Sequence, residues 1–194
     1  RQDTWDQKQR EVCYVGYINE ARGIKEVIAA LGRVKSDVTL SLGGTFSEED
    51  TSDYVRSLPG WSSVNELGFI GREEMREVLG RSVAGLVTFH AVPNHVEAQP
   101  NKIFEYMSAG IPVIASHFPL WREIVEGNGC GVCVDPEDPC DIARAIDWIL
   151  TEPESAAVMG DNGRRAVKEI YNWAEEQNRL LDFYDQLLKG AIGQ

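Results

Sequence analysis

Short apolar runs alternate with helical stretches along most of this chain. The runs are rich in β-branched residues and bounded by turn residues, a pattern typical of strands buried in a sheet. They are EVCYVG (11–16), DVTLSLGG (37–44), VNELGF (64–69), AGLVTF (84–89), IPVIAS (111–116) and GVCV (131–134). Strands that alternate with helices predict a parallel sheet covered on both faces. Right-handed crossovers make this a doubly wound, Rossmann-like α/β fold of about six strands.

The segments between the runs show helical spacing. Between residues 22 and 34, apolar residues recur every three or four positions, at Ile24, Val27, Ile28 and Leu31, which predicts one buried helix face. Further helices are expected over residues 47–58, 72–81 and 100–110, after each of the last two strands, and over residues 153–170 and 172–189. The last two exceed what the sheet needs, so we expect them to pack against something else. The predicted organisation is a tether (1–11), a Rossmann-like domain (12–170) and a C-terminal helix (171–194).

Composition narrows the classes of partner. The 194 residues carry a formal net charge of −12 and the pI is near 4.7. Such a surface repels nucleic acid phosphate, so nucleic acid is excluded as a partner and any bound anion must be held by a few local donors. No apolar run approaches the roughly 18 residues of a membrane-spanning helix. Because the chain starts with a polar segment and without Met, we expect a piece of a longer protein.

The pattern of cysteines does not indicate a metal site. CGVC, from Cys130 to Cys133, has the spacing of half a zinc site, but no second CxxC and no nearby His completes it. It also lies in a predicted buried strand, where Cys usually acts as a small apolar residue. We therefore predict reduced thiols, no bound metal and a cytoplasmic protein.

Two polar loops are expected at one edge of the predicted sheet. In a doubly wound sheet, ligands bind beyond the carboxyl ends of the strands, where the strand order reverses. With the order 3-2-1-4-5-6, the loops that flank this point are Gly16–Gly23 and His90–Lys102. The first carries Arg22. The second carries Glu97 and is longer than most such connections, as functional loops often are.

The helix after the fourth strand offers a place for an anion. It is expected to begin at Pro100, and the preceding Gln99 is a poor N-cap. Its first amides are therefore open to a phosphate or to capping water. The helix is apolar nearly all round, which predicts a largely buried helix. Glu105 within it either pairs with Lys102 or accepts hydrogen bonds from paired hydroxyls of a ligand.

Other nucleotide and catalytic motifs are absent from the sequence. No GxGxxG follows the first strand, no GxxxxGK[ST] occurs, and no Asp-x-Asp suggests a divalent metal on a diphosphate. His90, His95 and His117 lie in predicted loops without a Ser or Cys partner. We expect these histidines at the surface or in supporting roles.

Taken in order, several motifs resemble one known family. They are the E-x7-E spacing from Glu97 to Glu105, its extension PNKIFEYMSAGIPVIAS, YVG…ARG, LGFIGREEM and GCGVCVDPED. The chain resembles the C-terminal, donor-binding half of family-four retaining glycosyltransferases of GT-B fold, from about Val12 to Leu188. The extension is similar to the subset that acts in bacterial polysaccharide or lipid-linked glycan synthesis.

The resemblance implies roles for particular residues. Glu105 would bind the ribose hydroxyls of a nucleotide diphosphate sugar, and Glu97 would face the transferred sugar. Arg22 would lie on the diphosphate, with Gly16 allowing close approach, and the amides near Asn101 and Lys102 would meet the phosphates. Gly68 to Gly71, including Ile70, would line the base. The catalytic residues would be Glu97 and Arg22. One departure is Tyr17, where the family often has Arg, which removes a cation from the expected diphosphate site.

The resemblance also implies partners and chemistry. The donor would be a nucleotide diphosphate sugar, a UDP-sugar first, without metal or other cofactor. An acceptor glycan or lipid-linked sugar would bind an N-terminal domain that this chain lacks, and that domain would be the part able to touch the inner membrane. The chain alone would bind donor without transferring sugar. A nucleotide-sugar binding module without transfer activity and a GT-B epimerase stay open as alternatives.

Overall fold

The structure is a computed structural model that describes residue 5 and residues 8–192. Its strands are β1 (Glu11–Val15), β2 (Thr39–Gly43), β3 (Val64–Gly68), β4 (Ala84–Val87), β5 (Val113–Ser116) and β6 (Gly131–Val134). They form a six-stranded parallel sheet in the order β3-β2-β1-β4-β5-β6. Each strand lies within one of the predicted apolar runs, so the doubly wound α/β fold is confirmed.

Strand β1 lies at the centre of the sheet. It pairs with β2 from Glu11↔Thr39 to Val15↔Gly43, and with β4 through Val12↔Ala84 and Cys13↔Gly85. The loops that follow β1 and β4 therefore leave the same edge side by side, where the strand order reverses. The amide of His90 donates to the carbonyl of Ala21 at 2.9 Å, which joins the two loops directly.

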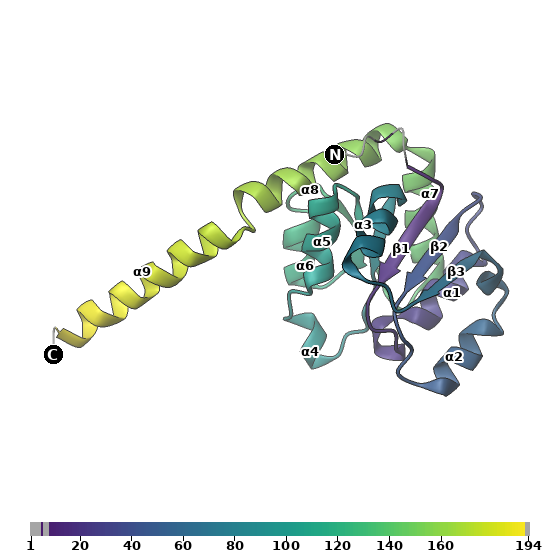
Figure 1. The fold of residues 1–194 in the computed structure, drawn as a ribbon, viewed down its shortest axis with the longest axis horizontal. Helices are drawn as coiled ribbons and strands as arrows, with labels where there is room; N and C mark the ends of the chain where they lie inside the picture. The colour runs from purple at the N-terminus through teal and green to yellow at the C-terminus, as the bar shows by residue number, and fades with distance from the viewer. Residues whose placement is uncertain (1–4, 6–7, 193–194) are drawn as a thin grey trace.

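Helices cover both faces of the sheet (Figure 1). On one face lie α1 (Ile24–Leu31), α2 (Glu49–Arg56) and α7 (Pro139–Thr151). On the other lie α3 (Arg72–Arg81), α5 (Asn101–Ala109) and α6 (Pro119–Val125), with α8 (Pro153–Glu169) against α5. The short helices η2 (Glu20–Arg22), η3 (Pro59–Ser63) and α4 (Pro93–Val96) lie in connections. Strands β4 and β5 are buried along their whole length, so the core surrounds the sheet.

Helix α8 packs on α5 and lies inside the predicted domain bounds 12–170, so the expectation that both final helices pack elsewhere is wrong for α8. Two glycines make its close packing on α5 possible. A Cβ at Gly160 would collide with the carbonyl oxygen of Gly110, and a Cβ at Gly163 would lie 3.1 Å from the Cα of Met107. Sequence periodicity alone did not distinguish a helix of this domain from a surplus one, because the contact depends on small residues.

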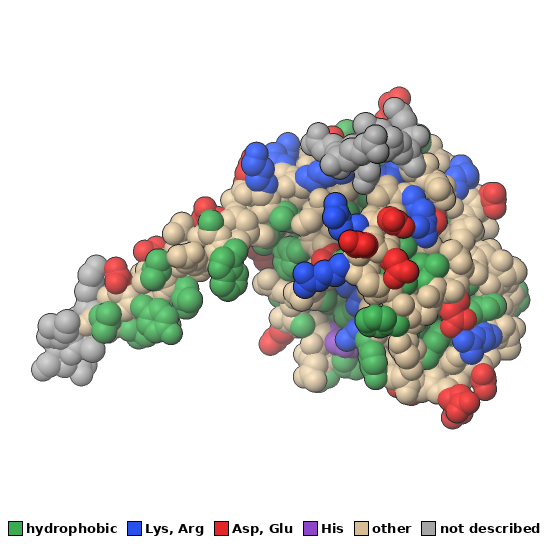
Figure 2. Space-filling view, in the orientation of Figure 1, with side chains coloured by type: hydrophobic (Ala, Val, Ile, Leu, Met, Phe, Trp, Pro, Cys, Tyr) green, Lys and Arg blue, Asp and Glu red, His purple; other side chains and the backbone are tan. Residues whose placement is uncertain are grey.

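Helix α9 (Trp173–Ile192) projects away from the body of the domain (Figure 1). Large apolar side chains lie along it and are more than half exposed: Trp173, Leu180, Leu181, Phe183, Tyr184, Leu187 and Leu188. Figure 2 shows hydrophobic side chains gathered along one side of this helix. An exposed apolar stripe of this size is typical of an interaction surface. Residues 193 and 194 of the predicted C-terminal helix lie outside the described residues.

The described part of the predicted tether lies on the domain. Trp5 packs against the core, and the Lys8 ammonium donates to the carbonyls of Leu79 and Gly80 at 3.0 and 2.7 Å. Residues 1–4 and 6–7 lie outside the described residues. Over the part of the chain that the structure covers, no helix is both long and apolar enough to span a membrane.

Candidate functional site

Gly16, Arg22 and Lys102 gather at the carboxyl edge beside β1. Gly16 has φ +131, and a Cβ built there would lie 2.6 Å from the Lys102 Nζ. A side chain at position 16 would thus strain the backbone and displace the lysine. Arg22 is held by its Nη1, which donates to the Tyr17 carbonyl at 3.2 Å. The structure therefore brings together three of the residues predicted for a diphosphate.

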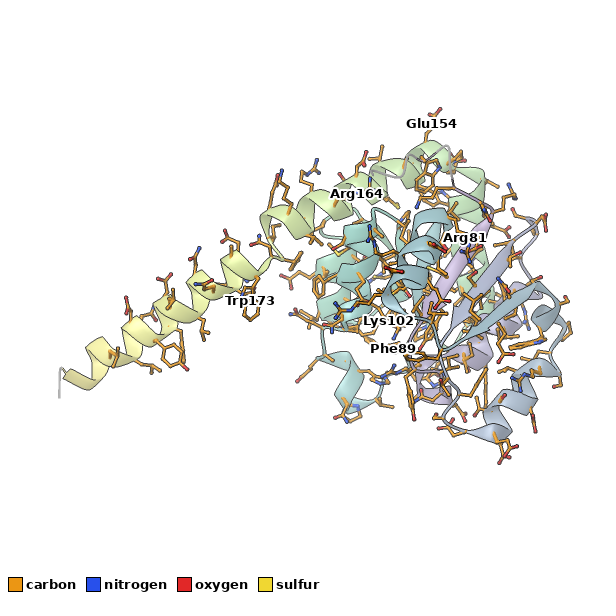
Figure 3. All side chains as sticks on the ribbon, viewed as in Figure 1. Arg81, Phe89, Lys102, Glu154, Arg164 and Trp173 are labelled. Atoms are coloured by element: carbon orange, nitrogen blue, oxygen red, sulfur yellow. The ribbon has the colours of Figure 1, made fainter. Side chains whose placement is uncertain are left out.

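Arg22 and Lys102 share one aromatic ring. The Cζ of Arg22 lies 5.3 Å from the centre of the Phe89 ring, and the Nζ of Lys102 lies 5.5 Å from it. Lys102 is also 5.1 Å from the Tyr14 ring. Figure 3 shows Lys102 and Phe89 close to each other near the end of β1. Among the described residues, no carboxylate lies within 4.0 Å of either cation.

The electrostatics of the pair favour an added anion. Burial lowers the pKa of Lys102 to about 8, the nearby Arg22 charge lowers it as well, and Glu105 acts in the opposite direction. Tyr14 stays neutral because burial raises its pKa to about 12, and its hydroxyl donates to the Tyr17 carbonyl at 2.6 Å. Arg22 and Lys102 repel each other, so an anion between them would stabilise the charged form of Lys102.

The first backbone amides of α5 are further hydrogen-bond donors next to Arg22 and Lys102. Pro100 is the N-cap, and it provides no side-chain hydrogen bond to the first turn. The prediction of an uncapped helix start is confirmed, with Asn101 rather than Pro100 as the first helical residue. Because the helix dipole also favours negative charge here, the amides of Asn101 and Lys102 can complement the two cations.

Glu105 is exposed, which corrects the prediction that α5 is buried nearly all round. The helix has one exposed face, formed by Asn101, Glu105 and Ser108 at helical spacing. Counting apolar residues overestimated its burial, because Phe104 is only half-buried. No ion pair within 4.0 Å joins Glu105 to Lys102 across the described residues, although the sequence allowed one.

The exposed face of α5 borders a groove of about 790 Å³. Helices α3, α5 and α8 form its walls, and Arg76, Asn101, Glu105 and Tyr171 are among the lining residues. Glu105 thus faces open space next to the start of α5. A carboxylate in this position is free to accept hydrogen bonds from a ligand that extends from the cation pair.

A second hollow of about 260 Å³ lies beyond β1 and β2. It is lined by Val15, Gly16, Tyr17, Gly43, Gly44, Thr45, Phe69 and Ile70. The structure therefore places Ile70 at a hollow shared with Gly16. Gly68 does not line the hollow but shapes the turn beside it, since its carbonyl accepts the Gly44 amide at 2.7 Å. Phe69 is 86% exposed at its rim.

Glu97 is exposed at the end of α4, in the loop between β4 and α5. Trp121 holds this loop through a hydrogen bond, which its indole Nε1 donates to the Ala98 carbonyl at 2.7 Å. Its sequence predicted an irregular connection, but it contains the short helix α4, which begins with Pro93 at a position that favours proline. Glu97 and Arg22 thus lie on adjacent loops of one edge.

Residues 1–166 match the family model of glycosyl transferases group 1. The chain belongs to this family. Glycogen synthase of Mycobacterium tuberculosis (strain ATCC 25618 / H37Rv) is 25% identical to it over 167 residues, which are 84% of this chain and 39% of that protein. The chain spans less than half the length of the curated relatives it matches.

Solved structures of glycosyltransferases share the fold. The Anabaena protein HepE, solved in complex with UDP and glucose, superposes with a TM-score of 0.79 at 18% identity, over 92% of this chain and 49% of that one. The C-terminal domain of a glycosyl transferase group 1 family protein (LpcC) from Francisella tularensis superposes with a TM-score of 0.71 at 19% identity, over 89% and 93% of the two chains.

Two aromatic residues at the site of this group 1 glycosyl transferase chain were not expected from the sequence. Arg22 and Lys102 both lie over the Phe89 ring. The Tyr106 hydroxyl accepts a hydrogen bond of 3.3 Å from the amide of Val15, the residue before Gly16. Phe89 ends the fourth apolar run at the ligand-binding edge, and that position is a signal that could have found it. The described residues hold no cluster of three or more His, Cys, Asp or Glu suited to a metal ion.

The histidines support the loops of the family site. The His90 Nε2 lies 3.0 Å from a carboxylate oxygen of Glu26 on α1. His95 Nδ1 donates to the His90 carbonyl at 3.1 Å, and this bond requires the proton on Nδ1. His117 Nδ1 lies 2.8 Å from the Val134 carbonyl. Each imidazole contacts a neighbouring element or its own loop, which is consistent with the expected supporting roles.

Proposed function

We propose that this chain is the donor-binding half of a glycosyltransferase that transfers a sugar from a nucleotide diphosphate sugar to an acceptor hydroxyl. The pair of cations on Phe89 is the observation that carries the proposal. The chain has a net charge of −12, yet it places Arg22 and Lys102 together at the edge of the sheet where ligands bind. Within the described part of the chain, no carboxylate lies within 4.0 Å of either cation. The diphosphate of a sugar nucleotide has the charge and size to bridge them.

The site residues bind different parts of the donor, with the nucleoside on one side of the diphosphate and the sugar on the other. Arg22, Lys102 and the first amides of α5 bind the diphosphate. Glu105 accepts hydrogen bonds from the ribose diol, and the hollow at Ile70 receives the base. Glu97, on the adjacent loop, reaches the hydroxyls of the transferred sugar. UDP-sugars are the first donors to test, because HepE was solved with UDP bound.

The chemistry assigned to this half is stabilisation of the leaving group. As the bond to the sugar breaks, negative charge builds on the diphosphate, and fixed cations and amides stabilise that charge more strongly than they stabilise the bound donor. Arg22 and Lys102 supply two positive charges without a metal. We infer that transfer proceeds with retention of the anomeric configuration, on the basis of the E-x7-E pattern of Glu97 and Glu105.

The acceptor is assigned to a second domain. The chain superposes on nearly all of a C-terminal domain solved on its own, yet spans about half of HepE. The apolar stripe of α9 is suited to pack on such a second domain, because its width exceeds the narrow seam of a two-stranded coiled coil. The acceptor would be a glycan or a lipid-linked sugar, and the isolated chain would bind donor without transfer.

Thermal melting with nucleotides tests the donor site. UDP, ADP and GDP are added separately to the 194-residue chain in the presence of EDTA. At least one is expected to raise the melting temperature, because a ligand of the native state stabilises it by mass action. Stabilisation that requires Mg²⁺ or Mn²⁺ would contradict metal-free binding. Robust sugar transfer by this chain alone would show that no second domain is needed.

A further inference from the structure

Phe89 has an unusual set of neighbours for a core phenylalanine. Its side chain is 4% exposed and lies just past the end of β4. Two cations from different elements approach its ring, Arg22 at 5.3 Å and Lys102 at 5.5 Å. Distances below roughly 6 Å from the ring centre allow a cation–π interaction. The same ring therefore attracts both positive charges.

The ring is itself held in place by aromatic contacts. Trp121 on α6 meets it edge-on, with ring centres 5.5 Å apart and planes at 70°. His95 on α4 lies 4.9 Å away. These two residues also hydrogen-bond the loop that carries Glu97, through the carbonyls of Ala98 and His90. Phe89 thus links the cations to the loop of the predicted sugar contact.

We propose that Phe89 is a positioning residue for the reaction: its ring holds Arg22 and Lys102 next to each other while the site is empty and presents both to the diphosphate. The inference rests on the proposed function. Without a ligand the two cations repel each other, and the negative face of the ring offsets part of that repulsion. The donor then meets a site that is already arranged, so less of its binding energy is used for ordering side chains.

A leucine at position 89 distinguishes this role from ordinary packing. Leucine fills apolar space but has no ring quadrupole, so it would leave the two cations repelling each other. The charged and titratable groups around Lys102 are Arg22 from η2, Glu105 from α5 and Tyr14 from β1, and His95 from α4 packs on Phe89 itself. Phe89→Leu changes none of them.

Phe118 provides a matched control. It is 5% exposed and packs on the same Trp121, with ring centres 4.8 Å apart, but no cation is found within contact of its ring among the described residues. Phe118→Leu therefore removes the same atoms from the same aromatic cluster without touching the cation pair. Phe89→Tyr keeps the ring and serves as the conservative variant.

The experiment measures ligand binding and the Lys102 titration separately in the 194-residue chain. Binding of UDP and of inorganic pyrophosphate is measured by calorimetry, and the pKa of Lys102 by NMR on the free protein. Phe89→Leu is expected to weaken both ligands by about 5- to 30-fold and to lower the pKa of Lys102. Phe118→Leu should leave affinity and pKa unchanged, and Phe89→Tyr should retain most of the affinity.

Two results would overturn the positioning role. One is a Phe89→Leu protein that binds UDP and pyrophosphate as tightly as the unchanged chain. The other is a Lys102 pKa that stays the same or rises in Phe89→Leu, which would mean that the ring only excludes water. If the unchanged chain binds neither ligand, the proposed function fails, while the pKa comparison still decides whether the ring stabilises the cations.

Discussion

The indole of Trp121 on α6 donates a hydrogen bond of 2.7 Å to the carbonyl of Ala98, the residue directly after Glu97. Trp121 is fully buried and also packs on Phe89 and Phe118. One core side chain thus fixes both the backbone next to the predicted sugar contact and the ring under the cation pair. The position of Glu97 depends on the core of the domain rather than on its own loop.

Trp121→Phe should loosen the Glu97 loop. The change keeps an aromatic side chain but leaves the Ala98 carbonyl without its donor, which costs about 1–2 kcal/mol of unfolding free energy. We expect faster hydrogen exchange at residues 97–99, measured by NMR, and a lower midpoint in urea. Trp148→Phe on α7 is the control, because Trp148 is 38% exposed and its replacement should cost less than about 0.5 kcal/mol. Unchanged exchange in Trp121→Phe would show that the loop is held by other contacts.

Glu11→Gln should lower stability without affecting ligand binding. Glu11 is buried at the start of β1, at the edge of the sheet opposite the site, and both its oxygens accept from Nε of Arg81 at 2.9–3.0 Å. The neutral amide leaves Arg81 with a weaker partner, so the free energy of unfolding should fall by about 2–4 kcal/mol.

The exposed pair Arg56–Glu66, at 2.7 Å, is the control for Glu11. Glu66→Gln should change stability by less than about 1 kcal/mol, since solvent screens surface pairs. Both effects are measured by urea denaturation, with UDP binding measured by calorimetry. Loss of UDP affinity in a folded Glu11→Gln protein would contradict the view that Glu11, at the opposite edge of the sheet, does not affect the ligand site.

Lys102→Met should make the protein more stable and less able to bind an anion. At pH 7 the folded state carries a partly buried ammonium whose pKa is lowered to about 8 from 10.5. Methionine removes that cost, so unfolding free energy should rise by about 1–3 kcal/mol. UDP affinity should fall about 10- to 100-fold. Urea denaturation and calorimetry measure the two effects.

The stability gained in Lys102→Met should depend on pH in one direction only. Below pH 8, Lys102 is charged in both the folded and unfolded states, and the full cost is present. Between pH 8 and 10.5 the unfolded state binds the extra proton, so the stability of the unchanged protein rises with pH. The advantage of the methionine variant should therefore shrink above pH 8. Lys168→Met, at an exposed position on α8, should show no such trend, and an advantage independent of pH would mean that Lys102 is not the cause.

The sheet and the outline of the site could be predicted from sequence because they depend on local patterns. Apolar runs such as IPVIAS mark strands whatever surrounds them, and the strand order 3-2-1-4-5-6 is the usual one of a doubly wound sheet with right-handed crossovers. Placement of Arg22 on the edge follows in turn, because the loop after the first strand must leave at the carboxyl end. These inferences use periodicity and chain connection only.

The parts that could not be predicted depend on contacts between distant residues. Phe89 is one more apolar residue in AGLVTF, and only packing shows that Arg22 and Lys102 both meet its ring. The exposure of Glu105 was missed for a related reason. Whether Phe104 is covered depends on where α3 and α8 lie, and the groove between them leaves that face of α5 open.

The two glutamates of the E-x7-E spacing should bind different parts of the ligand. Glu105 borders the groove next to the start of α5, so its contact with the ribose diol should form with or without a sugar attached. Glu105→Ala is expected to weaken UDP and UDP-sugar alike, by about 10- to 100-fold. Ser108→Ala, on the same exposed face of the helix, should change neither affinity.

Glu97 lies ahead of the helix, on the loop held by Trp121, and should reach only the transferred sugar. Glu97→Ala is therefore expected to leave the affinity for UDP nearly unchanged while it reduces the preference for one UDP-sugar over others. Calorimetry on both variants with both ligands separates the roles. Since both carboxylates are exposed, neither change should alter the melting temperature of the free protein. A Glu97→Ala protein that loses UDP affinity as strongly as Glu105→Ala does would show that the loop acts on the nucleotide as well, and the division between the two acids would then be wrong.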